Sequence, residues 1–261
     1  CTTVCNSLSC QPDCLYYYKG QTSIPKQNQG LSLTLRIAFF FKNKYIIRQK
    51  ITEGKMTTTE NNLKITATCS SGLEDVLKEE IETFGAKIEN TGKNTVQFYT
   101  NTETLYKLNM ATRTATHFFL FLKQFFFKNA DEFYSKMKQI AWEKHFHVNK
   151  LIRIDTKGSS FAFRNSHFAT LRTKDAIVDR FRDICNDRPS VCKDEPEIQI
   201  TVYLQENQAI VYLDSSGIPL FKRGYRAIHA QAPLKEDLAA GILMLSGWDK
   251  KSDLIDPMCG S

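Results

Sequence analysis

The final residues of the chain have the composition of a nucleotide-binding turn. A short apolar stretch, residues 252–255, leads into Asp256-Pro257-Met258-Cys259-Gly260-Ser261. Rossmann-type sheets begin their nucleotide site with a strand, an acidic residue and a glycine-containing turn. Glycine lets the backbone approach the ligand, and the next helix supplies free N–H groups. One glycine is a weak signal by itself, and an ordinary turn is the alternative interpretation.

A basic block in the middle of the chain indicates that it binds a polyanion. The net charge is +7, of which residues 1–55 contribute +6. Residues 112–182 contain 14 Lys and Arg against 6 Asp and Glu, a net charge of +8, between acidic segments on both sides. Such a block could neutralise phosphates and release counterions, and a solvated surface with unequal charges is the alternative. The candidate phosphate-binding residues are Arg113, Lys150, Arg153, Lys157, Arg164, Arg172, Lys174, Arg180 and Arg182.

Aromatic side chains lie among these cations. Phe161, Phe163 and Phe168 surround Arg164 in a loop-like stretch that follows Gly158. Exposed rings at these positions could stack on unpaired bases of an RNA. Packing of the same rings in the hydrophobic core is the alternative, and it is the commoner role of phenylalanine.

Residues suited to metal binding or to catalysis are not grouped in the sequence. His145 and His147 are close together without a third ligand, and the four cysteines of residues 1–14 lack the usual C-x2-C spacing of a zinc site. We therefore expect no metal and identify no catalytic residue. No run of about 18 uncharged apolar residues occurs, so we expect no membrane partner.

The first 55 residues differ from the rest in having no sustained helical or strand period. We interpret 1–55 as a leader outside any domain. One hypothesis is that Met56 is the natural start and that 1–55 is upstream sequence that is not part of the native protein. A basic organellar targeting segment is the alternative.

The hydrophobic pattern predicts an α+β fold. The first unit has the order strand, helix, strand, strand, helix, strand, which is that of a ferredoxin-like domain. Its elements are expected at residues 63–69, 73–84 (with Ser70 or Ser71 as N-cap), 86–89, 95–99, 102–111 and 116–127. A second unit follows, with helices at 131–143 and 171–184 and strands at 151–156, 198–204 and 208–213. The last elements are a helix at 233–247 and a short strand at 252–255.

Four motifs near the C-terminus resemble those of a known family. They are residues 220–226 (LFKRGYR), 232–240 (APLKEDLAA), 246–248 (SGW) and 256–261 (DPMCGS), and residues 171–179 also resemble the family's THUMP helix. Together they resemble the THUMP-containing guanine-N2 RNA methyltransferases. The likeness is greatest to the bacterial-type enzyme of 23S ribosomal RNA, which is often labelled an N6-adenine-specific DNA methylase. The resemblance extends over residues 63–261.

The resemblance implies how the chain is organised. After the leader at 1–55, it implies a ferredoxin-like unit at 56–127, a THUMP RNA-binding domain at 128–214 (its start could be set near 100), a linker at 215–232 and the start of a Rossmann-type methyltransferase domain at 233–261. The family binds S-adenosylmethionine, and by resemblance Asp256, Pro257, Cys259 and Gly260 would line the cofactor's amino-acid end.

The sequence departs from the family where catalysis would occur. The Gly-Thr that completes the cofactor motif and the Asn-Pro-Pro-Tyr stretch that holds the target base do not occur in it. We therefore expect a truncated methyltransferase domain, no cofactor bound by this chain, no methyl transfer, and poor anchoring of residues 235–261.

The resemblance implies that the chain is the RNA-binding portion of an S-adenosylmethionine-dependent guanine-N2 methyltransferase. Its partner would be structured RNA, ribosomal RNA first and tRNA second. It would act in the cytoplasm, or in an organelle if 1–55 is a targeting segment. The alternative function is a non-catalytic THUMP module that serves as adaptor for a separate RNA-modifying enzyme. A DNA methylase is disfavoured, because it follows only from a naming tradition.

Overall fold

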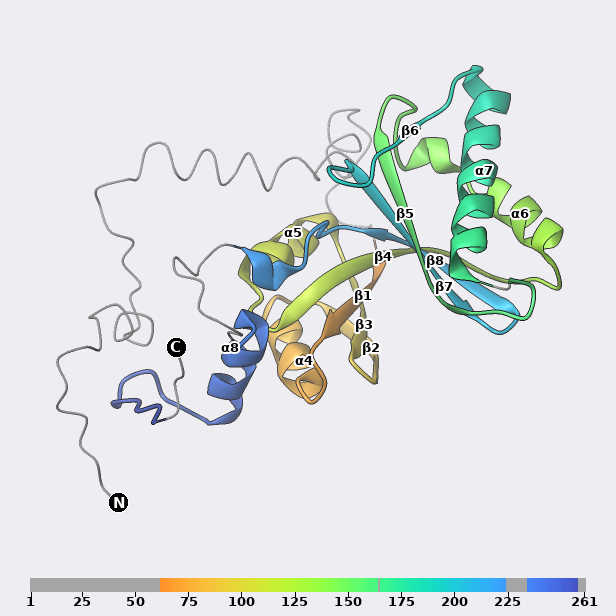
Figure 1. Cartoon of the computed structure of the whole chain (residues 1–261). Coiled ribbons are helices and arrows are strands. Elements are labelled where there is room, and N and C mark those ends of the chain that lie inside the picture. The colour runs from red at the N-terminus through yellow and green to blue at the C-terminus, as the bar shows by residue number, and fades with distance from the viewer. Residues whose placement is uncertain (1–61, 164, 224–233, 258–261) are drawn as a thin grey trace.

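The computed structural model of the chain describes residues 62–163, 165–223 and 234–257 (Figure 1). The leader at 1–55 and three of the predicted site residues, Arg164, Cys259 and Gly260, lie outside the described residues. The described strands form one mixed sheet of eight strands in the order β2-β3-β1-β4-β8-β7-β5-β6. The α+β fold predicted from the sequence is confirmed.

The first half of the sheet is a ferredoxin-like unit, with the element order that the hydrophobic pattern predicts. Its elements are β1 (Leu63–Cys69), α4 (Glu74–Thr83), β2 (Lys87–Gly92), β3 (Thr95–Thr100), α5 (Thr102–Ala111) and β4 (Ala115–Phe126). The strands pair antiparallel, with β1 between β3 and β4. Alternate residues such as Ile65, Phe98 and Phe118 point to the helices and are fully buried in a first core.

The start of α4 differs from the prediction that Ser70 or Ser71 caps it. The N-cap residue is Leu73, which makes no side-chain cap. The Glu74 carboxylate instead accepts the backbone N–H groups of Gly72 and Asn94, both at 2.8 Å. These bonds lower the pKa of Glu74. Ser70 does not cap the helix. Its hydroxyl instead donates to the Asp237 carboxylate at 3.2 Å.

Strand β4 belongs to both halves of the sheet. Its residues up to Leu120 pair with β1, and its residues from Phe119 onward pair with β8. Phe118 lies in the first core, Phe125 lies in a second core, and Leu120 packs against both. The Phe-rich stretch is therefore core for the most part, as the sequence indicated, although Phe126 points outward and is 60% exposed.

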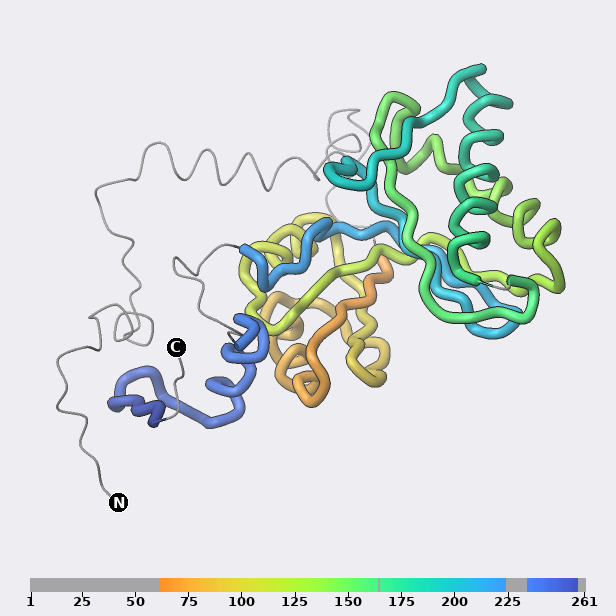
Figure 2. Tube along the Cα trace, in the orientation of Figure 1, coloured from red at the N-terminus to blue at the C-terminus, as the bar shows by residue number. Residues whose placement is uncertain are grey.

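The second half of the sheet carries two helices. Its elements are α6 (Ala130–Lys138), the 3-10 turn η1 (Trp142–Lys144), β5 (Leu151–Ser159), α7 (Ser166–Cys185), β6 (Ser190–Val191), β7 (Ile198–Gln205) and β8 (Gln208–Asp214). Strands β5 and β7 are parallel, whereas β7 and β8 form an antiparallel hairpin. Figure 2 shows how the chain crosses from one half of the sheet to the other and returns through β8.

Two helix bounds differ from the prediction by five residues each. The helix expected at 131–143 ends at Lys138, because the Trp142 indole N–H turns back to donate to the Met137 carbonyl at 3.0 Å inside the core. Helix α7 begins at Ser166 rather than at 171, since Asn165 caps it by accepting the N–H of Phe168 at 2.8 Å. At its other end Asn186 adopts a left-handed conformation, which stops the helix.

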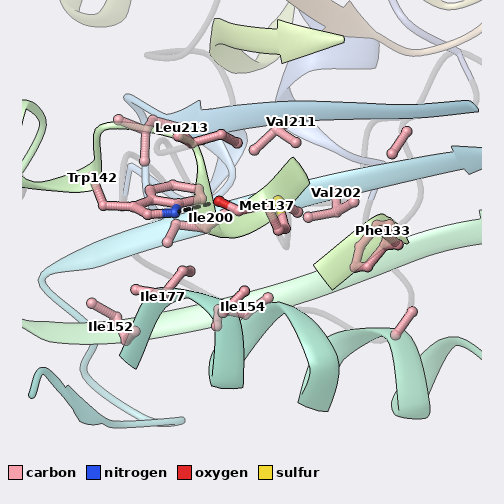
Figure 3. Close-up of a cluster of buried hydrophobic side chains, with 14 of the residues drawn as sticks. Phe133, Met137, Trp142, Ile152, Ile154, Ile177, Ile200, Val202, Val211 and Leu213 are labelled. Atoms are coloured by element: carbon pink, nitrogen blue, oxygen red, sulfur yellow. Dashed lines mark hydrogen bonds between the residues drawn. The ribbon is translucent and has the colours of Figure 1, made fainter. Parts of the chain in front are cut away.

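The second core lies between the sheet and helices α6 and α7 (Figure 3). Phe133 and Met137 of α6 and Ile177 of α7 pack against buried positions of the strands. The strand residues in contact are Ile152, Ile154, Ile200, Val202, Val211 and Leu213. This packing fixes the direction of α7, and thereby the side on which its polar residues lie.

The end of the described chain is better anchored than expected. Helix α8 (Glu236–Leu245) packs beside α4, and its residues Asp237 and Gly241 are buried. The expectation of poor anchoring is therefore wrong for the first two turns of α8, although Ile242 and Leu245 are exposed. The strand expected at 252–255 is not found, because no strand of the described residues pairs with it. Within the described chain, no helix has the length and apolar character that crossing a bilayer requires.

Candidate nucleic-acid interface

The predicted cations do not share one surface. Lys157 and Arg153 alternate with the buried Ile152 and Ile154 on β5, so they point to the face of the sheet opposite α7. Four other predicted cations lie on α7, and Arg113 lies in the ferredoxin-like unit. The structure therefore divides the basic block between two faces.

The cations of α7 differ in how firmly they are held. Arg180 donates to both carboxylate oxygens of Glu143, at 2.6 and 2.7 Å, and to the Lys138 carbonyl at 3.1 Å. This bidentate bond lowers the pKa of Glu143 and raises the pKa of Arg180. Arg180 thus joins α7 to η1 and to the end of α6, which is a structural contact.

Three cations of α7 make more exposed pairs. Arg172 donates to Asp131 at 2.7 Å and stacks 4.7 Å from the ring centroid of Tyr134. Lys174 lies 3.1 Å from its neighbour Asp175, and Arg182 lies 3.3 Å from Asp179. Surface ion pairs of this kind contribute about 0–1 kcal/mol, so an anionic ligand such as a phosphate can compete with the carboxylate.

Lys150 and Arg113 have other surroundings. Lys150 is buried, and its ammonium lies 2.8 Å from Glu197, whose second oxygen accepts the Leu151 N–H at 3.1 Å. Arg113 is exposed, and its backbone N–H donates to the buried carboxylate of Glu80. Lys150 therefore joins two neighbouring segments of the second half of the sheet, while the side chain of Arg113 is on the surface.

A groove runs between α7 and the edge strand β6. Its volume is about 660 Å³, within the range of roughly 300–1,000 Å³ that small ligands occupy. Tyr134 lies at one side, and its hydroxyl donates to Asp179 at 2.7 Å, which raises the pKa of the tyrosine. The lining residues are Tyr134, Arg172, Lys174, Asp175, Val178, Asp179, Arg182, Arg188, Pro189, Ser190 and Val191.

Arg188 is a cation of the groove that the charge pattern of the sequence did not predict. Its side chain is exposed and forms no ion pair with a carboxylate of the described residues. It lies in the segment 183–221, which has a net charge of −5. A count of charges by segment therefore did not single out Arg188, and the fold shows that it lines the groove beside α7.

The opposite face of the sheet carries aromatic rings. Phe119 is 3% exposed and packs against Tyr203 and Tyr212, with ring centroids 6.3 and 6.0 Å away. Burial raises the pKa of Tyr212. The Lys157 ammonium lies over Phe119 and Tyr203, 5.9 and 5.5 Å from the ring centroids. These rings pack on one another, and Lys157 places a positive charge over them.

The three phenylalanines near Arg164 have different environments. Phe163 is buried, with its ring centroid 4.9 Å from that of Phe133, so the core interpretation is right for this residue. Phe161 is 91% exposed, and Phe168 is half exposed. The chain enters this loop through Gly158, whose φ is +87° and where a Cβ would overlap the Leu204 carbonyl. In the loop, the Phe161 ring is exposed to solvent.

The described part of the proposed cofactor motif is exposed. Asp256 and Pro257 are exposed, Ile255 is 84% exposed, and no strand of the described residues pairs with this segment. A nucleotide cradle needs backbone N–H groups held in a fixed concave turn. The described residues also contain no group of three or more His, Cys, Asp or Glu that could hold a metal ion.

Comparison with known families matches three successive stretches of the chain. Residues 64–117 match the RlmL ferredoxin-like domain, residues 127–214 match the THUMP domain, and residues 223–261 match the RMKL-like methyltransferase domain. The first match ends inside β4, the second begins just after it, and the third contains α8.

Curated relatives share this part of the sequence. The chain is 38% identical over 212 residues to the ribosomal RNA large subunit methyltransferase K/L of Marinomonas sp. (strain MWYL1), covering 79% of this chain and 29% of that protein. It is 40% identical over 200 residues to the protein of the same name from Desulfotalea psychrophila (strain LSv54 / DSM 12343). This match covers 75% of this chain and 28% of that protein. The chain spans less than a third of the length of these relatives.

Solved structures share the fold and lead to the same family. A "possible methylase" from Clostridium difficile 630 superposes with a TM-score of 0.64 at 26% identity, covering 72% of this chain and 50% of that one. SMU.472, which is named a methyltransferase and was solved in complex with SAH, superposes with a TM-score of 0.63 at 27% identity. The match covers 73% of this chain and 50% of that one. The chain therefore combines an RlmL-type ferredoxin-like domain, a THUMP domain and residues that match the RMKL-like methyltransferase domain.

Proposed function

We propose that this chain is the RNA-holding portion of an S-adenosylmethionine-dependent methyltransferase that modifies the N2 of a guanine in large-subunit ribosomal RNA, in the cytoplasm. One observation carries the proposal: a ferredoxin-like unit and a THUMP domain share strand β4 and are followed by α8 of a methyltransferase domain. Relatives at 38–40% identity are named large-subunit rRNA methyltransferases.

The groove beside α7 is the RNA-backbone site in this proposal. Four cations line it (Arg172, Lys174, Arg182 and Arg188), against two carboxylates, which leaves an excess of two positive charges. Phosphates are attracted by such an excess, and partly exposed guanidinium groups can bind them in a bidentate manner. Because the carboxylates are already on the surface, exchanging them for phosphates costs little.

The cations of the opposite face can belong to the same RNA path. Strand β6 is the edge of the sheet, and it forms one wall of the groove. Arg153 lies on the neighbouring strand β5 and donates to the Lys193 carbonyl just beyond β6. An RNA strand that leaves the groove across this edge reaches Arg153 and then Lys157. Phe161, at the loop that ends β5, offers a ring for an unpaired base.

The cofactor would supply an electrophilic methyl group to the guanine nitrogen. We propose Asp256, Pro257, Cys259 and Gly260 as residues of its site, because they lie in the stretch that matches the methyltransferase domain. The described residues Asp256 and Pro257 do not form a cradle, so we assign no step of the reaction to them. We expect calorimetry with this chain to detect no binding of S-adenosylmethionine.

The proposal is tested on ribosomal RNA from cells with and without the gene. Digestion of the large-subunit RNA and mass spectrometry of its nucleosides should show the loss of one N2-methylguanosine. Loss of a different methylated nucleoside contradicts the assignment to guanine N2, and unchanged RNA contradicts the enzyme. In parallel, the purified chain should bind a labelled rRNA fragment more tightly than duplex DNA of equal length. Equal binding of both contradicts an RNA-specific surface.

A further inference from the structure

Helix α8 is joined to the ferredoxin-like domain by a buried carboxylate. Asp237, in the first turn of α8, is 1% exposed. Its Oδ2 accepts hydrogen bonds from the Ser70 hydroxyl at the end of β1 and from the Thr116 hydroxyl on β4, both at 3.2 Å. Its Oδ1 accepts the N–H of Leu238 at 2.9 Å. Burying a carboxylate is costly unless it is hydrogen-bonded, so these hydroxyls make the position of α8 specific.

Close packing supports the same contact. A Cβ built on Gly241, one turn after Asp237, would overlap the side chain of Leu73. Leu73 is itself buried in the first core, where Leu238 also packs, so it can yield only by displacing core neighbours. The helix can approach α4 this closely because position 241 is a glycine.

The segment that leads toward α8 is also attached to this domain. Leu220 is buried in the first core, and the guanidinium of Arg223 donates to the carbonyls of Thr112 and Asn109 at the end of α5. The Lys235 ammonium, just before α8, lies 5.5 Å from the ring centroid of Phe221. The contacts on both sides of residues 224–233 are thus made with one domain.

We infer that Asp237 is the latch that fixes the first helix of the methyltransferase domain on the ferredoxin-like domain, so that this domain is a platform that positions the methyltransferase domain. The platform shares β4 with the THUMP domain, and the latch hydroxyl of Thr116 is on that same strand. The contact of α8 with the ferredoxin-like domain does not depend on the proposed function. The consequence that we draw from this contact, a fixed distance between the groove and the methyltransferase domain, rests on the proposed function.

Hydrogen exchange of the α8 amides tests the latch in the chain as it exists. In Asp237→Asn, exchange of residues 240–245 should accelerate by about 10- to 100-fold, because a hydrogen bond to a charged group is weakened. Glu236→Gln is the matched control: it removes one negative charge from the same helix turn, with the same effect on the helix dipole, and should change exchange less than about threefold. Equal effects of the two variants would overturn the inference.

Conservative and non-conservative changes of Thr116 separate a specific latch from general loosening. Thr116→Val should accelerate exchange in α8, whereas Thr116→Ser keeps the hydroxyl and should restore protection. Exchange of β7 in the THUMP domain should stay at the wild-type rate in every variant. If Thr116→Ser behaves like Thr116→Val, or if β7 accelerates together with α8, Asp237 is not a latch. RNA affinity should not change in these variants; a wild-type chain that fails to bind RNA contradicts the proposed function and leaves the latch standing.

Discussion

Reversing the charges of Arg182 and Arg188 in the groove should weaken RNA binding and flatten its salt dependence. Both side chains are exposed, and neither is held by a bidentate bond like that of Arg180. If the four groove cations each neutralise one phosphate, the slope of log affinity against log salt is about −2.8 to −3.6. Between 50 and 200 mM salt the wild-type chain should then lose roughly 50- to 150-fold in affinity.

The double variant Arg182→Glu, Arg188→Glu loses two of these four contacts. Its slope should fall to about half, and the same change in salt should cost only roughly 7- to 12-fold. Fluorescence anisotropy with a labelled rRNA fragment, at four or more salt concentrations, measures both slopes. The control is Lys78→Glu, Lys87→Glu, an equal charge change in the ferredoxin-like domain, which should keep the wild-type slope.

Two results would refute this reasoning. If the control variant flattens the slope as much as the groove variant, the attraction is diffuse and the groove is no RNA site. If the groove variant binds more weakly but keeps the full slope, the two arginines act without contacting phosphates. A thermal unfolding curve for each variant shows whether it is folded. The ion pair lost in the groove variant, between Arg182 and Asp179, is on the surface, so the midpoints should differ little from that of the wild type.

Three further predictions concern the fold. Gly158→Ala should destabilise the chain by roughly 1 kcal/mol or more in urea unfolding, since the new Cβ meets the Leu204 carbonyl at a positive φ; unchanged stability would contradict the geometry. Trp142→Phe removes the N–H bonded to the Met137 carbonyl and should cost about 0.5–1.5 kcal/mol for that hydrogen bond, because the carbonyl keeps the Ile140 N–H as a donor. Burial raises the pKa of the Cys69 thiol to about 12. Because the unfolded chain ionises this thiol from about pH 8.5 upward, stability should fall as the pH rises through that value, and less so in Cys69→Ala.

Local patterns in the sequence predicted the elements where each has a single buried face. The bounds of β1 and α5 agree with the prediction, because alternate residues of β1 and the spaced leucines of α5 enter the core and Asn101 caps the helix. Helix α7 was predicted to begin five residues too late. Its first turn, Ser166 to Phe168, is exposed and therefore lacks the apolar period that marks the rest.

The site depended on contacts that a sequence does not display. Arg180 is one of several arginines in the basic block, and only the fold brings it to Glu143, 37 residues away. Arg188 shows the opposite error. It was not predicted because its segment of the sequence has a net negative charge, but in the fold it lines the groove together with residues of α7. Charge counting therefore pointed to the domain that contains the groove, but it could not separate cations that hold the protein together from those that are open to a ligand.

The shared strand determines how the two ends of the molecule can act together. The groove proposed to bind RNA lies at the β6 edge of the sheet, while the latch of α8 lies at Thr116, where β4 pairs with β1. Hydrogen-bonded strands connect the two places without interruption, so their separation does not depend on residues 224–233. Most two-domain proteins are joined by a linker, and relative motion is the usual expectation for them. Here a continuous sheet joins the ferredoxin-like and THUMP domains in place of a linker. Under the proposed function it sets which nucleotide, counted from the phosphates bound in the groove, can reach the methyltransferase domain.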